Sequence, residues 1–162
     1  TVDSIVDDLV DIVSKNGALL LNIGPRKDGT IPEIEQQMLR EIGQWLAING
    51  EAIYGTSPWK IYGEGPTEII EGTFNDVKRG AFTAEDIRFT TKGETLYATA
   101  LAWPEDGKMT VKSLGTAAGQ VASVSLVGGG ELQFEQSAEA LTVTLPEQRH
   151  CEHAVSVKVA FG

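Results

Sequence analysis

The spacing of hydrophobic residues changes along the chain, from helical periods at the start to strict alternation towards the end. A first helix is predicted to begin at Ser4, a favourable N-cap, and to end at the Asn16-Gly17 pair, which suits a left-handed stop. A second helix is predicted to begin at a capping box formed by Thr30 and Glu33 and to end near residue 49. The apolar positions of the two helices are Ile5, Leu9, Ile12, Val13, Ile34, Met38, Ile42, Trp45 and Leu46. Both helices are therefore predicted to be amphipathic.

An apolar run at residues 18–23, interrupted only by Asn22, lies between these helices. Such a run is typical of a strand that is covered on both faces, as in a parallel sheet. Helix, strand and helix in succession are the repeating order of a (β/α)8 barrel, but a closed barrel needs about 250 residues. We therefore expect the run to pack against further protein, from the same polypeptide or another chain. Otherwise its apolar side chains should be exposed.

Short alternating segments follow a turn-rich connector that contains Gly63, Gly65 and Pro66. Their alternating residues are Ile87/Phe89/Thr91, Tyr97/Thr99/Leu101/Trp103, Met109/Val111, Val124/Leu126, Leu132/Phe134, Leu141/Val143/Leu145 and Val155/Val157/Val159/Phe161. About seven short strands separated by turns indicate an antiparallel two-sheet sandwich. The predicted fold class is thus α/β plus all-β: the last helix-strand-helix of a (β/α)8-type barrel over residues 1–60, followed by a β-sandwich over residues 61–162.

Composition limits the classes of partner. The chain has 162 residues, is 41% hydrophobic and 22% charged, and carries a formal charge of −10, which disfavours nucleic acid and anionic membranes. No apolar stretch approaches the roughly 18 residues of a membrane span, and no leader pattern begins at Thr1. Cys151 is the only cysteine, so an internal disulfide is excluded.

Several residues are candidates for a ligand pocket. Asn22, Pro25, Arg26 and Asp28 lie at or after the carboxyl end of the predicted strand, which is the active-site face of a barrel. The alternative is that they form a solvated turn. Trp59, beside a proline in the connector, is a candidate for stacking on a sugar, whereas the patterns around Trp45 and Trp103 favour core positions for those two residues.

Two other segments contain residue types found in phosphate or metal sites. The segment from Gly24 to Gly29 precedes a helix and contains basic residues, as phosphate sites do, but its spacing is not that of a P-loop. His150, Cys151, Glu152 and His153 could supply metal ligands, yet adjacent residues rarely converge on one ion. We therefore predict neither a phosphate nor a metal site, and a structural role for Cys151.

Several motifs in the sequence resemble those of glycoside hydrolase family 29, the α-L-fucosidases. The first part of the resemblance is carried by KNGALLLNIGP at residues 15–25, DGTIP at 28–32 and GQWLAINGEAIYGT at 43–56. The second part is carried by GAFTAEDIRFTTKG at residues 80–93, with the shorter matches Leu96-Tyr97-Ala98, Trp103-Pro104, Ser113-Leu114-Gly115 and Leu145-Pro146. Two separate groups of matching segments in the expected order support the resemblance more strongly than either group alone.

The resemblance implies a retaining exo-hydrolase that removes terminal α-L-fucose from glycans without a cofactor. It also implies that the nucleophile and the acid/base precede Thr1, so no catalytic residue is assigned in this chain. The implied partners are a fucosylated glycan and the remainder of the barrel, and the implied location is periplasmic or extracellular. The alternative is a non-catalytic carbohydrate-binding or structural β-sandwich with a short helical lead.

Overall fold

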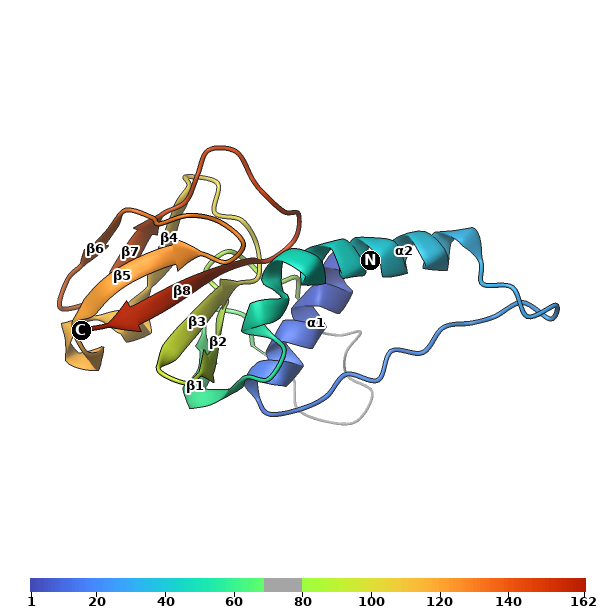
Figure 1. The fold of residues 1–162 in the computed structure, drawn as a ribbon, viewed down its shortest axis with the longest axis horizontal. Helices are drawn as coiled ribbons and strands as arrows, with labels where there is room; N and C mark the ends of the chain where they lie inside the picture. The colour runs from blue at the N-terminus through green and yellow to red at the C-terminus, as the bar shows by residue number, and fades with distance from the viewer. Residues whose placement is uncertain (69–79) are drawn as a thin grey trace.

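The computed structural model describes residues 1–68 and 80–162 (Figure 1). Its helices are α1 (Val2–Ser14) and α2 (Glu33–Asn49), with short 3-10 turns η1 (Gly50–Ala52), η2 (Lys112–Leu114) and η3 (Thr116–Ala118). The described strands are β1 (Ser57–Glu64), β2 (Ile87–Lys92), β3 (Thr95–Ala100), β4 (Lys108–Val111), β5 (Val121–Leu126), β6 (Phe134–Gln136), β7 (Leu141–Thr144) and β8 (Val155–Phe161).

The strands of the described residues form two antiparallel sheets. One has five strands in the order β1-β2-β3-β8-β5, and the other has three in the order β4-β7-β6. Residues from the facing sides of both sheets, including Phe89, Met109, Val143 and Val157, fill one apolar core. The predicted alternating segments therefore form strands β2 to β8, and the predicted β-sandwich is confirmed.

The other face of the five-stranded sheet is covered by the two helices. Val6 and Val10 of α1 and Trp45 of α2 form a second apolar cluster with Leu101, at the end of β3. Strands β2, β3 and β8 are consequently buried on both faces along most of their length. Figure 1 shows α1 and α2 near the β1–β3 end of this sheet, with β4, β6 and β7 at the other end of the molecule. The helical lead and the sandwich are therefore packed together in layers.

The helix boundaries differ from the prediction at their N-termini. The N-cap of α1 is Thr1, which forms the capping box with Ser4, so Ser4 occupies the third helical position. At α2, Pro32 precedes the helix without a side-chain cap, because the Thr30 side chain hydrogen-bonds to Asp28 instead. The predicted capping box at Thr30 is therefore wrong, whereas the predicted stop after α1 is confirmed by the positive φ of Asn16, 66°.

The strand predicted at residues 18–23 is not formed in this chain. Residues 17–32 contain neither helix nor strand and form a long loop that extends away from the sheets (Figure 1). Leu20 is 94% exposed and Leu21 is 41% exposed. A strand needs a neighbour to pair with its N–H and C=O groups, and α1 and α2 offer none. The alternative expectation, a bare apolar segment, is the one observed.

The predicted connector also contains regular structure. Residues 57–64 form β1, an edge strand that pairs with β2, while Gly65 and Pro66 form the bend that follows. The predicted boundary between residues 60 and 61 falls within this strand. No helix in the described part of the chain is both long and apolar enough to cross a bilayer.

Candidate functional site

Asn22 lies in the loop between α1 and α2, beside a shallow pocket. The pocket is lined mainly by apolar residues of the loop and the two helices: Ile5, Leu21, Ile23, Met38, Leu39 and Ile42. Its polar side is formed by Asn22 and Glu35. The Glu35 carboxylate accepts a hydrogen bond from the backbone N–H of Gly24 (2.9 Å), which ties the loop to the first turn of α2.

The remaining loop candidates lie in an exposed turn at residues 25–30. The Arg26 N–H donates to the Thr30 carbonyl (2.8 Å), and Asp28 accepts from the Thr30 N–H (3.0 Å) and hydroxyl (2.7 Å). These hydrogen bonds from Thr30 lower the pKa of the Asp28 carboxyl. Asn22, Pro25, Arg26 and Asp28 are thus brought onto one exposed segment, and the Asp28 carboxylate stabilises the local turn.

Trp59 lies on β1, on a different element from the loop candidates. Its ring contacts the ring of Phe89 edge-on, with centroids 5.0 Å apart, and the Lys60 ammonium lies 4.4 Å from its centroid. It is half-buried against the sandwich core. Its role in sugar stacking stays a prediction, while the core positions predicted for Trp45 and Trp103 are confirmed.

Three of the four potential metal ligands before β8 lie against separate partners, and the fourth, Glu152, is exposed. His150 Nε2 lies 3.0 Å from the Val127 carbonyl, and His153 Nδ1 lies 3.0 Å from the Asp3 carboxylate on α1. The Cys151 sulfur lies against Asn49, and burial raises the pKa of its thiol. Among the residues that the structure describes, no group of three or more histidine, cysteine or acidic side chains is placed to hold a metal ion. The segment therefore serves to join the helices to the sheet.

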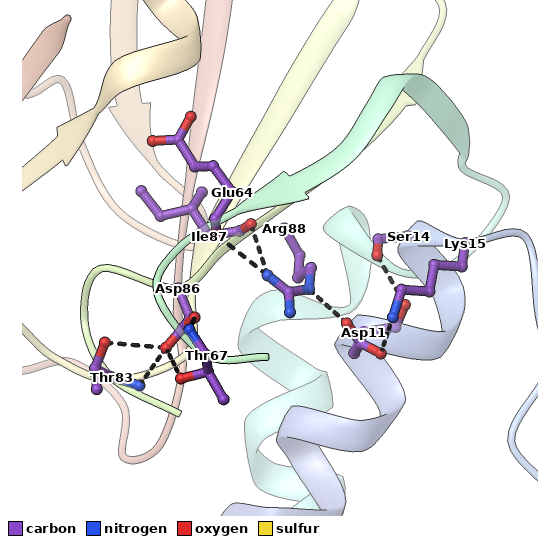
Figure 2. Close-up of polar contacts among 9 residues, drawn as sticks. All are labelled: Asp11, Ser14, Lys15, Glu64, Thr67, Thr83, Asp86, Ile87 and Arg88. Carbon is purple, nitrogen blue, oxygen red and sulfur yellow. Dashed lines mark hydrogen bonds and ion pairs between the residues drawn. The ribbon is translucent and has the colours of Figure 1, made fainter. Parts of the chain in front are cut away.

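A buried charged contact between α1 and β2 was not predicted. Arg88 is 3% exposed, and its Nε donates to Asp11 on α1 (2.5 Å). Its Nη1 donates to the carbonyls of Glu64 (3.2 Å) and Ile87 (3.1 Å) (Figure 2). The second oxygen of Asp11 accepts from Lys15 (2.7 Å). Because Asp11 and Arg88 are 77 positions apart, spacing along the sequence carried no signal of this pair.

A second buried carboxylate, Asp86, secures the backbone next to Arg88. It accepts from the N–H and hydroxyl of Thr67 (3.0 and 2.8 Å) and from the N–H and hydroxyl of Thr83 (2.7 and 3.0 Å) (Figure 2). Burial opposes ionisation of Asp86, but these hydrogen bonds outweigh it, so the pKa lies below its ordinary value. Gly65 has a φ of 136°, and a β-carbon there would overlap Asp86, so glycine is required at this position.

Comparisons with known proteins identify the family of this chain. The family model described as "Alpha-L-fucosidase" matches residues 1–51, and the model described as "Alpha-L-fucosidase C-terminal domain" matches residues 81–160. The chain belongs to the α-L-fucosidase family. The first match covers the helical lead, and the second covers most of the sandwich. The Asp11–Arg88 contact joins a residue from each match.

Individual fucosidases agree with this assignment. The tissue α-L-fucosidase of Mus musculus is 37% identical over 147 residues, which are 90% of this chain and 28% of the mouse protein. The α-fucosidase of Thermotoga maritima, solved in complex with fucose, superposes with a TM-score of 0.76 at 33% identity over 99% of this chain and 34% of that one. Isoenzyme 1 of Paenibacillus thiaminolyticus superposes with a TM-score of 0.74 at 27% identity over 100% and 35% of the two chains.

The chain spans about a third of the length of these relatives. The barrel strand that the sequence predicts at residues 18–23 is not formed in this chain, so the fold of residues 1–51 gives no independent support for a barrel. Membership of the family is shown by the matches.

Proposed function

We propose that this chain is the carboxyl-terminal part of a retaining α-L-fucosidase that hydrolyses terminal α-L-fucose from glycans. The observation that carries the proposal is the bare apolar segment at residues 18–23, which lies between two helices within the match to the fucosidase model. An apolar segment of this kind calls for a partner, and the remainder of a catalytic barrel supplies one.

In this proposal, residues 18–23 become the closing strand of the barrel when the preceding polypeptide is present. Pairing on both edges satisfies the backbone N–H and C=O groups that the loop leaves to water. Burying Leu20 and Leu21 contributes about 1.5–3 kcal/mol for each side chain. The proposed barrel part extends to about residue 60, and its last residues already belong to β1 of the sandwich sheet, so the two parts are joined within that strand.

The chemistry requires two carboxyl groups about 5–5.5 Å apart, one as nucleophile and one as acid/base. Both are expected before Thr1, and this chain contributes no catalytic residue. Asn22, Pro25, Arg26 and Asp28 would come to lie at the carboxyl end of the closing strand, where barrel enzymes bind their substrates. Trp59 is retained as a further candidate for the wall of the pocket. The substrate is a fucosylated glycan.

The test compares the full-length parent with the chain of residues 1–162 on a fluorogenic α-L-fucoside. We expect the parent to release the fluorophore and the chain alone to be inactive. A parent that leaves the α-L-fucoside intact would contradict the proposal. In the same experiment, titration of the chain with fucose tests the alternative of a binding module, because such a module would bind the sugar without the barrel.

A further inference from the structure

The structure assigns to Arg88 a role as a positioning residue: through Asp11 it holds α1, and with it the strand proposed to close the barrel, in the register that the active site needs. This inference rests on the proposed function. Arg88 lies on the sandwich, far along the sequence from the barrel segment, and it acts through the helix that leads directly into residues 18–23.

The guanidinium of Arg88 is fixed on several sides. Besides Asp11, it binds the carbonyls of Glu64 and Ile87, which belong to the two paired strands β1 and β2. The ring centroids of Phe82 and Tyr62 lie 5.1 and 5.5 Å from the guanidinium carbon. A planar group held by several directed contacts has little freedom to move. Arg88 therefore presents Nε to α1 from a rigid part of the sandwich.

Asp11 receives this contact close to the end of α1. The helix ends at Ser14, whose hydroxyl donates to the Asp11 carbonyl (2.7 Å), and the loop to residues 18–23 follows within one turn. Lys15 holds the second carboxylate oxygen (2.7 Å). The Asp11–Arg88 pair thus fixes the part of α1 from which the proposed strand emerges.

The directed contacts of Arg88 fix the register of α1, which the surrounding apolar contacts do not. Val2, Val6 and Val10 pack α1 against α2 and the sheet, but apolar contacts depend on area and are tolerant of small rotations and shifts. A buried ion pair contributes little net stability compared with apolar side chains of similar volume, whereas it can select one arrangement among several. The Asp11–Arg88 pair therefore serves to fix the register of α1 relative to the sheet.

The register of α1 would determine where Asn22 and the following residues meet the substrate. Displacing reacting groups by about 1 Å costs on the order of 100-fold in rate. The test uses the full-length fucosidase with the double substitution Asp11→Leu/Arg88→Met, which replaces the ion pair by apolar side chains and removes both charges together. Lys158→Met is the matched control, because it breaks the Lys158–Glu51 pair (2.6 Å) elsewhere on the same sheet.

We expect the double variant to stay folded but with a lower melting temperature, because a methionine at position 88 cannot donate to the carbonyls of Glu64 and Ile87. At a temperature where it is folded, it should lose roughly tenfold or more in kcat/KM, with a fall in kcat. The control should keep both kinetic constants. Arg88→Lys, which keeps the charge but not the planar fork, should lose about threefold or more at an unchanged melting temperature. If either Asp11→Leu/Arg88→Met or Arg88→Lys folds and retains the wild-type kcat and KM, Arg88 is a structural residue only and the inference is wrong. A wild-type parent without α-L-fucosidase activity would refute the proposed function instead.

Discussion

Removing the Asp86 carboxylate tests how the sandwich holds the chain that precedes β2. Asp86 is fully buried and accepts four hydrogen bonds, two from backbone N–H groups and two from hydroxyls. In Asp86→Ala the hydroxyls of Thr67 and Thr83 can turn to water, but the two amides lose a charged acceptor in a partly buried setting. A hydrogen bond to a charged group contributes about 1.5–3 kcal/mol, so losing the two amide bonds should cost roughly 2–4 kcal/mol once water replaces part of the loss.

Urea unfolding of the 162-residue chain, followed by circular dichroism and tryptophan fluorescence, measures this cost. With a urea dependence of about 2 kcal/mol/M, the midpoint should fall by roughly 1–2 M. Asp106→Ala is the matched control, because this exposed aspartate caps a turn with one bond to the Lys108 N–H (2.9 Å), and it should shift the midpoint by less than about 0.5 M. A shift in Asp86→Ala no larger than that of the control would refute the reasoning.

Three further predictions concern exposure and pH. Leu20→Ala should leave the unfolding midpoint of this chain unchanged, since Leu20 is 94% exposed. It should destabilise the full-length parent by about 2–5 kcal/mol in thermal or urea unfolding, and equal effects in both proteins would contradict the proposed burial of Leu20 in a barrel. Because the pKa of Asp86 is lowered on folding, the stability it contributes should be complete above about pH 4 and lost as the pH falls through the folded value. Urea midpoints from pH 6 to 2 should therefore decline more steeply for the wild type than for Asp86→Asn, and parallel curves would count against this assignment. Burial and the Glu51 carboxylate raise the pKa of Tyr97 from 10.0 to about 12, so the unfolded state loses its proton first and stability should fall between about pH 10 and 12. Tyr97→Phe should lack that part of the decline, and an identical alkaline profile for both proteins would show that Tyr97 ionises equally in the two states.

The sandwich could be predicted from sequence because its signal is local. Alternation of apolar residues with turn residues between them locates strands β2 to β8, and each segment needs only its own few residues to be recognised. Residues 57–64 gave no such signal. Strand β1 is an edge strand that is largely exposed, and its pairing with β2 is irregular between Pro58 and Gly63, so its pattern of apolar residues is weak.

The apolar run at residues 18–23 shows the limit of the same reasoning. Its composition indicates a strand between two covered faces, but whether such a strand forms depends on neighbours that a single segment cannot supply. In this chain Leu20 and Leu21 remain exposed, and the loop is held instead by Glu35 and by the turn around Asp28. The apolar pattern therefore indicates that residues 18–23 need neighbouring strands, and the structure shows that this chain supplies none to them.

The candidate site was only partly accessible to sequence reasoning for a similar reason. The position of Asn22 near the end of an apolar run could be predicted directly, and in this chain Asn22 lies beside a shallow pocket, while its contact with a sugar stays a prediction. The Asp11–Arg88 contact could not, because it depends on how a helix packs across a sheet, and an arginine in an alternating strand is ordinarily read as solvent-facing. Its burial follows from the helical layer, which covers the face of β2 that would otherwise meet water.

Hydrogen exchange at the amides of residues 18–23 tests the central claim most directly, by comparing the 162-residue chain with the full-length parent. Amides in a loop exchange quickly, whereas amides paired within a closed sheet exchange only through opening of the fold. We predict rapid exchange in the chain alone and strong protection in the full-length parent. Rapid exchange in both proteins would contradict the assignment of these residues to a closing barrel strand.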